Sequence, residues 1–293
     1  MAQRIGAKRM WGWLLTAAAC ALSASGCVST VSDEPEEQAL AEESAELKNG
    51  TVFNGKGRSS GAVGIFMWSP VWGSTKCSGQ VVSRRTILTA AHCVIRAVLQ
   101  PGQPAANPGT TKITVFRPSE TSSHVVVLSD ATVVTYYNPL WDTQGTSYDV
   151  GLFIATTDLQ NVTSGDAGLL AKSTPSNVLM YAFGFGYFGD GPTLYDDIGR
   201  SGALWPTYSS SALEYFFSAT STQPQICGGD SGGPLKSATS GPLLVYGVTS
   251  YHTGPGTYCR PVGHWAAVAN SMNWLRGKIS GNCLETSVLY SCW

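Results

Sequence analysis

The stretch QICGGDSGGPL, residues 225–235, places four glycines around one aspartate and one serine. A serine hydroxyl is a poor nucleophile at neutral pH and needs a neighbouring base to take its proton. Glycines let the backbone turn tightly and bring its amides close to a reacting group. The stretch therefore predicts either a plain glycine-rich turn or a loop built around a nucleophilic Ser231.

His92 is the candidate base, in the stretch TILTAAHCV (86–94), where an apolar run leads into small residues. Imidazole has a pKa of about 6.5, which suits proton transfer near neutral pH. A carboxylate behind the ring would fix its tautomer and stabilise the imidazolium that forms. Asp149, in SYDVGLF (147–153), is the candidate. Asp142 is its rival, but Pro, Gly and Asn around it indicate a loop, so we interpret Asp142 as a turn former.

A histidine beside a cysteine, as in His92 and Cys93, could instead be structural or a metal ligand. A metal site needs two or three further ligands at suitable spacing. The sequence contains neither CxxC nor HxxxH. We therefore expect no metal.

The composition favours an all-β protein. The chain has 293 residues, enough for one large core or two small barrels, with 33 glycines, 15 prolines and 10% aromatic residues. Only 13% of residues are charged and the net charge is −1, so we expect no nucleic-acid partner. Short β-rich runs alternate with turn signals and predict a barrel or a sandwich. The runs are GAVGIFMW (61–68), SGQVVS (78–83), TKITVF (111–116), HVVVLSDATVVTYY (124–137), DVGLFIA (149–155), NVLMYAFGFG (177–186) and PLLVYGVTSY (242–251).

One helix is predicted late in the chain, over residues 265–279. Ala267, Met272, Leu275 and Ile279 recur there near helical spacing, and Gly281 could end the helix. The segment 283–292 begins and ends with cysteine. The closeness of Cys283 and Cys292 favours a local pair that closes a small C-terminal tail, residues 283–293.

The first 26 residues predict an export signal, because Arg4, Lys8 and Arg9 precede an apolar stretch that ends in small residues. An uncleaved membrane anchor is the alternative. ASGC, ending at Cys27, resembles a bacterial lipoprotein signal, although Ala24 stands where leucine is usual; ordinary cleavage nearby is the other possibility. Either route takes the protein out of the cytoplasm, secreted or lipid-anchored.

Residues 27–46 form an acidic spacer or pro-segment. Residues 28–46 hold seven acidic side chains and no basic one, and contain little to bury. A short acidic helix is the alternative.

Two segments, TAAHC (89–93) and GDSGGPL (229–235), resemble the signature segments of the chymotrypsin/trypsin-like serine proteases. SYDVGLF resembles the family's strand that carries the third catalytic residue, and the order His, Asp, Ser is that of the family. The resemblance covers about residues 47–282. It implies two packed antiparallel six-stranded β-barrels with a C-terminal helix, and no cofactor.

The resemblance also implies a role for each site residue. Ser231 is the nucleophile, His92 the general base and then acid, and Asp149 the orienting carboxylate. The amides of Gly229 and Ser231 form the oxyanion hole. Asp230 pairs with a new amino terminus after pro-segment cleavage, and Leu47 is the best match for that terminus. The following Lys48 and Asn49, and the preceding Glu46, depart from the family pattern.

Six cysteines outside the leader allow 15 pairings, and the residues alone do not choose among them. The resemblance implies that Cys77 pairs with Cys93 and Cys227 with Cys259. Animal relatives have further bridges for which this chain lacks cysteines.

The resemblance places five residues around the first substrate pocket: Gln225, Ser250, Tyr251, His252 and Gly263. The neutral Gln225 at the base argues against strict specificity for Arg or Lys. A neutral pocket with a histidine could accept apolar, amide-bearing or acidic side chains. Alternatively, His252 is a surface residue and Gln225 only caps the pocket.

We therefore expect an exported, monomeric serine endopeptidase that is made as a precursor and acts on peptides or proteins. Two alternatives stay open: a catalytically silent binding module on the same fold, and a hydrolase that acts mainly on esters.

Overall fold

The computed structural model describes residues 47–54, 60–69, 73–98, 109–118, 124–141, 146–191, 198–238, 243–279, 281 and 283–293. The expected leader, Cys27 and the acidic spacer lie outside these described residues, as does Asp142. All described residues belong to one unit, which spans residues 43–293.

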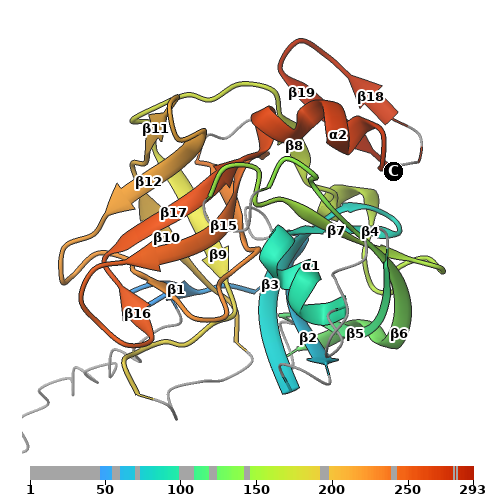
Figure 1. Ribbon diagram of the computed structural model, residues 1–293, viewed down its shortest axis with the longest axis horizontal. Coiled ribbons are helices and arrows are strands. Elements are labelled where there is room, and N and C mark those ends of the chain that lie inside the picture. Colours follow the sequence, from blue (N-terminus) through green and yellow to red (C-terminus); the bar gives the residue numbers. More distant parts are fainter. Residues whose placement is uncertain are drawn as a thin grey trace, which may run out of the picture. The chain divides into compact units, whose positions relative to one another are not determined.

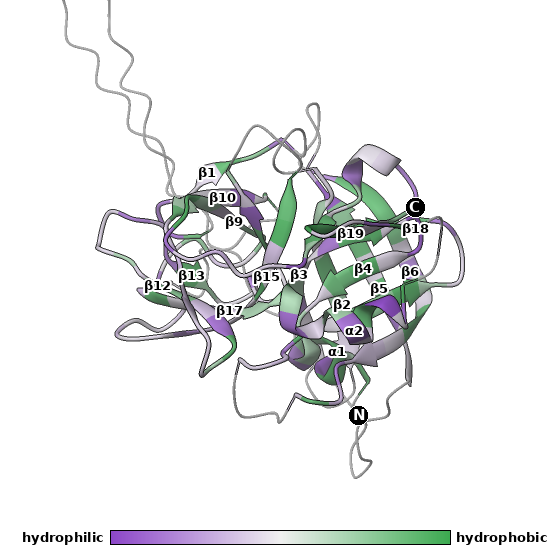
Figure 2. Cartoon of the chain, turned by 90° about the horizontal axis from the view of Figure 1, so that it is seen from above, coloured by the Kyte–Doolittle hydropathy of each residue, from purple (hydrophilic) through white to green (hydrophobic). Residues whose placement is uncertain are grey.

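The strands between residues 62 and 155 form a closed antiparallel barrel (Figure 1). In order around the barrel they are β2 (Ala62–Ser69), β3 (Gly73–Ser83), β4 (Thr86–Thr89), β7 (Gly151–Ala155), β6 (Val125–Tyr137) and β5 (Gly109–Arg117). In β2, Ile65 and Met67 are buried whereas Phe66 and Trp68 are exposed. This alternation is what a strand with one face on a core requires, and Figure 2 shows that the barrel strands carry many of the apolar residues.

The remaining strands form a larger sheet (Figure 1). Its main path runs through β1 (Thr51–Val52), β10 (Arg200–Leu204), β9 (Met180–Gly184), β14 (Pro234–Ser237), β15 (Leu244–Thr253), β17 (Val262–Ala267), β12 (Glu214–Ser218) and β11 (Thr207–Ser209). Three strands attach beside this path: β8 (Leu169–Ala171), β18 (Cys283–Glu285) and β19 (Leu289–Cys292). A separate two-stranded pair joins β13 (Ile226–Cys227), which lies just before the serine loop in sequence, to β16 (Cys259–Arg260). The fold is thus mostly β, as expected for a double-barrel protein.

Ser78, in β3, ties the barrel to the loop that carries Ser231. Its backbone N–H donates to the carbonyl of Ser231 over 2.7 Å. Its hydroxyl donates to the carbonyl of Gly229 over 2.9 Å and accepts the N–H of Phe185 over 3.0 Å. One strand residue of the barrel therefore holds the glycine-rich loop at two points.

The C-terminal helix is shorter than the predicted range 265–279. Residues up to Ala267 belong to β17, because Ala266 pairs with Glu214 on one side and with Val248 on the other. A 3₁₀ turn, η3 (Val268–Ser271), then leads into α2 (Met272–Arg276). Gly277, not Gly281, follows the last helical residue. Among the described residues, α1 (Ala91–Val98) and the 3₁₀ turn η2 (Ser164–Asp166) are also helical.

Three disulfides join the six cysteines in the predicted pairs. They are Cys77–Cys93, Cys227–Cys259 and Cys283–Cys292. The third closes the hairpin β18–β19, whose strand β19 also pairs with β8. The tail is thereby attached to the edge of the larger sheet.

Candidate active site

His92 and Asp149 lie on neighbouring segments at one end of the barrel. His92 is the second residue of α1, which follows β4, and Asp149 comes two residues before β7. Because β4 and β7 are paired strands, with Thr89 opposite Gly151, the segment after one strand meets the segment before the other. The pairing thus positions the imidazole and the carboxylate.

The carboxylate of Asp149 holds His92 through two hydrogen bonds. Its Oδ2 accepts from Nδ1 of His92 over 2.8 Å, and its Oδ1 accepts the backbone N–H of His92 over 3.0 Å. The hydroxyl of Ser250 donates to the same Oδ2 over 2.5 Å. An ionised carboxylate can only accept, so Nδ1 carries the ring proton and Nε2 of a neutral ring is left with its lone pair.

Asp149 is ionised at neutral pH although its side chain is only 2% exposed. Burial would raise its pKa, but the neighbouring His92 and the hydrogen bonds from His92 and Ser250 outweigh that effect, so the pKa lies below its usual value. A negative charge is therefore fixed behind the imidazole. It favours the imidazolium that would form if Nε2 took a proton.

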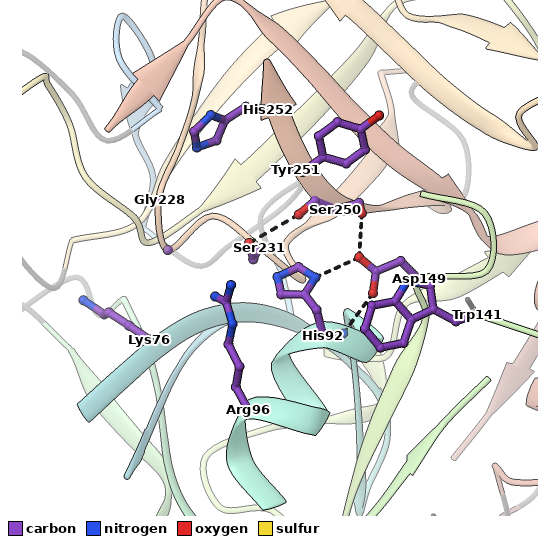
Figure 3. A pocket seen from close by; sticks show the side chains of 11 residues that line it. Lys76, His92, Arg96, Trp141, Asp149, Gly228, Ser231, Ser250, Tyr251 and His252 are labelled. Carbon is purple, nitrogen blue, oxygen red and sulfur yellow. Dashed lines mark hydrogen bonds and ion pairs between the residues drawn. The ribbon is translucent and has the colours of Figure 1, made fainter. Parts of the chain in front are cut away.

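Ser231 faces the imidazole across the cavity shown in Figure 3. Its hydroxyl donates to the carbonyl of Ser250 over 3.4 Å. Among the described residues, no hydrogen bond joins the Ser231 hydroxyl to Nε2 of His92. Rotation of the hydroxyl away from Ser250 would be needed to make one, and such bonds are often long or missing without substrate.

The amides of Gly229 and Ser231 are the two uncommitted ones in the glycine-rich loop. The amides on either side donate to backbone carbonyls: Gly228 to Tyr258, Asp230 to Cys227, Gly232 to Thr249 and Gly233 to Asp230. For Gly229 and Ser231 no backbone acceptor exists within the described part of the chain. Gly229 has a φ of +96°, a conformation that favours glycine. The loop therefore presents the two amides that the sequence analysis assigned to an oxyanion hole.

Gly232 explains why the loop can sit this close to the barrel. It has a φ of +87°, and a Cβ there would lie 2.1 Å from Oγ1 of Thr89 and 2.3 Å from the carbonyl oxygen of Ser78. A side chain at this position would push the loop away from β3 and β4. The absence of a side chain at Gly232 thus lets the serine loop pack directly against strands β3 and β4 of the barrel.

A cavity of about 500 Å³ contains the three predicted catalytic side chains. Its lining consists of Lys76, His92, Arg96, Trp141, Asp149, Gly228, Gly229, Ser231, Ser250, Tyr251 and His252. Lys76, Arg96 and Trp141 were missed by the sequence analysis. Arg96 follows His92 by four residues on α1, so helical spacing could have placed the two on one face. Lys76 precedes the disulfide cysteine Cys77, and Trp141 lies in a loop. No periodic pattern in the sequence points to either residue.

The predicted pocket residues divide into two groups. Ser250, Tyr251 and His252 line the cavity, whereas Gln225 and Gly263 are not part of its described lining. The side-chain amide of Gln225 donates to the carbonyl of Thr220 over 3.3 Å, and its backbone N–H donates to the carbonyl of Lys48 over 2.9 Å. Gln225 is thus engaged with the surrounding backbone.

Asp230 is fully buried beneath the loop. Its carboxylate accepts the N–H of Gly186 over 2.9 Å and the N–H of Cys227 over 2.8 Å. Burial, only partly offset by these bonds, raises the pKa of Asp230 to about 7. A positive charge brought next to this carboxylate would lower that pKa and strengthen the contact.

The segment that starts at Leu47 lies inside the larger sheet's core. The Leu47 side chain is completely buried, with Met180 and Ile226 among the members of its core cluster. Lys48 forms a bridge with Gln225. The side-chain amide of Asn49 donates to the carbonyls of Ser221 and Gln223. Lys48 and Asn49 therefore tie this segment to residues 221–225, just before β13.

Cys77, His92 and Cys93 bring three metal-ligand atoms within 4.8 Å of one another. Both sulfurs belong to one disulfide, so neither can supply the thiolate that a metal site of this kind requires. The cluster is better explained as a bridge that fixes α1 to β3. It restrains the helix that carries His92.

The family model described as Trypsin matches residues 52–275. The chain belongs to the Trypsin family. The match runs from β1 into α2 and contains His92, Asp149 and Ser231. The family supports peptidase function, with peptides or proteins as substrates.

Disulfides together with a trypsin-like domain are typical of extracellular proteins.

Within the described residues, no helix has the length and apolar character needed to cross a membrane.

Proposed function

We propose that this chain is an exported serine endopeptidase that hydrolyses peptide bonds through an acyl-enzyme intermediate. The proposal depends most on one observation. Asp149 accepts hydrogen bonds from both the backbone N–H and the ring of His92, and both residues line a cavity with Ser231. This arrangement orients a neutral imidazole with its basic nitrogen free for a serine proton. A glycine-rich turn with an incidental serine would need neither feature.

In the proposed reaction, the Ser231 hydroxyl swings from Ser250 toward His92 and attacks the scissile carbonyl carbon. Nε2 takes the hydroxyl proton as the Oγ–C bond forms. The carbonyl oxygen becomes an oxyanion and accepts hydrogen bonds from the backbone N–H groups of Gly229 and Ser231. Losing one such donor typically costs roughly 10²–10³ in rate. The imidazolium then protonates the leaving amine as the C–N bond breaks.

The acyl group now sits on Ser231 as an ester. A water molecule attacks the ester carbon while Nε2 of His92 takes its proton. The second tetrahedral intermediate collapses, the proton returns to Oγ of Ser231, and the carboxylic acid product leaves. Every step uses groups of this chain and water, so the proposal includes no metal or organic cofactor.

We further propose that the protein is made as a precursor with four regions. They are a signal in residues 1–26, an acidic pro-segment in 27–46, the protease domain in 47–282 and the disulfide-closed tail in 283–293. The family match over 52–275 falls inside the third region. The buried Asp230, with its raised pKa, is suited to receive an ammonium from Leu47.

Mass spectrometry of the active protein tests the activation step. Leu47 at the amino terminus is the expected result, and an active form that retains Glu46 in peptide linkage would contradict it. Mass spectra of the segment that begins at Cys27 report whether that cysteine carries a lipid, which separates lipid anchoring from ordinary secretion. Sedimentation of the mature protein tests the expected monomer.

A peptide library with the Ser231→Ala variant tests the enzymatic proposal. Cleavage by the wild type that is lost in Ser231→Ala and kept in Ser211→Ala, a substitution in an exposed turn, is the expected result. Hydrolysis of esters without hydrolysis of peptides would favour the esterase alternative. A protein that cleaves nothing and does not react with a serine-directed phosphonate would be a silent binding module on this fold.

A further inference from the structure

Ile226 and Trp265 fill the space next to Gly263, a residue that the family resemblance places beside the substrate pocket. A Cβ added at Gly263 would lie 2.6 Å from Cγ1 of Ile226 and 2.7 Å from the outer ring of Trp265. Both distances are shorter than any real Cβ contact, so the two side chains already occupy the room that this glycine leaves. Both are almost completely buried. The glycine therefore faces packed apolar atoms.

The described lining of the open cavity includes neither Ile226 nor Trp265. On the serine side its lining consists of Gly228, Gly229 and Ser231, and on the opposite side of Ser250, Tyr251 and His252. Gln225, the residue expected at the bottom of the pocket, instead donates its side-chain amide to the carbonyl of Thr220. The part of the cavity beside Ser231, here called the recess, thus stops short of Gly263, and the space next to Gly263 is filled by Ile226 and Trp265.

His252 lines the same cavity, next to Tyr251. Figure 3 places its ring over the gap between Gly228 and Tyr251. Burial, together with the charge of Arg260, lowers the pKa of His252 to about 4, so the ring is neutral at pH 7. A neutral ring gives no ion pair to an acidic side chain, and the carboxylate would lose its hydration on entering.

We propose that this enzyme cleaves after residues with small side chains, such as alanine, and that Ile226 is the residue that excludes larger ones. The inference rests on the proposed endopeptidase function and specifies its substrate class. It replaces the acidic option that the sequence left open. Removing carbon atoms from Ile226 would deepen the recess toward Gly263 and admit a larger side chain.

Peptide p-nitroanilides that differ only in the residue before the cleaved bond test the proposal. We expect the mature wild type to show a kcat/KM for alanine at least tenfold above those for phenylalanine, lysine and glutamate, in line with the 10–200-fold that pocket fit commonly supplies. We expect Ile226→Ala to raise the phenylalanine-to-alanine ratio of kcat/KM at least tenfold. The control Ile113→Ala truncates an equally buried isoleucine of the barrel and should leave the ratio unchanged.

Two results would overturn the inference without contradicting the proposed endopeptidase function. One is a wild type that prefers phenylalanine, lysine or glutamate; the other is an Ile226→Ala variant with an unchanged ratio. Alanyl and phenylalanyl phosphonates provide a second readout through their rates of attachment to the protein, which need no turnover. A wild type that neither cleaves any substrate nor reacts with either phosphonate would overturn the endopeptidase function and this inference with it.

Discussion

Lys236→Met should remove a rise in the free energy of unfolding that the wild type shows as the pH increases above 7. Lys236, in β14, is 1% exposed, and its ammonium donates to the carbonyl of Ser60 over 2.7 Å. It also lies 5.1 Å from the ring centre of Phe183. The carboxylate of Asp166, which acts on this ammonium through its charge, is already paired with Arg117. A lysine buried in this way carries its charge at a cost.

The magnitude follows from the pKa of Lys236. Burial, opposed only in part by Asp166, lowers this pKa from the usual 10.5 to about 7. Between these values the unfolded chain binds a proton that the folded protein does not, so the free energy of unfolding rises with pH. Each pH unit contributes about 1.4 kcal/mol. Because the folded lysine is still half protonated at pH 7, the wild type should gain about 2 kcal/mol relative to Lys236→Met between pH 7 and pH 9.

Urea unfolding at both pH values measures this difference. Both proteins would carry Ser231→Ala, which prevents self-digestion, and both keep Asp230, whose own titration cancels. Below pH 7 the methionine variant should be the more stable, because the lysine is then charged in both states and only the folded state pays for burial. A difference between the two proteins that stays constant from pH 7 to pH 9 would refute the reasoning. It would mean that Lys236 keeps an ordinary pKa in the folded protein.

Three further substitutions have separate expected outcomes. Asp149→Asn keeps the shape but stabilises the wrong tautomer of His92, so kcat should fall by roughly 10⁴ with intact folding; a loss below tenfold would contradict the orienting role. Ser250→Ala removes a hydroxyl from a buried carboxylate and should lower the free energy of unfolding by about 1.5–3 kcal/mol in urea; an unchanged midpoint would argue against that bond. Replacing Cys283 and Cys292 together by serine should cost up to about 3 kcal/mol of stability but leave kcat/KM within twofold; loss of activity would tie the tail to the site.

The sequence predicts the strands and the catalytic cluster well, because both leave local signals. Short β-rich runs bounded by turn signals predict strands at 61–68 and 124–137, where the structure has β2 and β6. TAAHC and GDSGGPL place His92 and Ser231, and the structure brings both into one cavity with Asp149. That convergence depends on strand pairing far apart in sequence, so the resemblance was needed to expect it.

The sequence alone could not predict where the C-terminal helix begins or how deep the substrate pocket is. Ala267 fits the apolar spacing of a helix, but the residues up to it pair with β12 and β15, and tertiary pairing overrides spacing. The position of Gln225 was predicted, but the rotation of its side chain toward Thr220 depends on packing. The contact of Ile226 with the space at Gly263 likewise joins two strands that no sequence pattern relates.

The site of covalent attachment by a diphenyl phosphonate tests the central claim most directly. Peptide mass spectrometry of the treated mature protein should find the adduct on Ser231. Because His92 must take the hydroxyl proton, His92→Ala should slow attachment by at least 10² while leaving the protein folded. An adduct on another residue, or attachment to Ser231 at an unchanged rate in His92→Ala, would contradict the account.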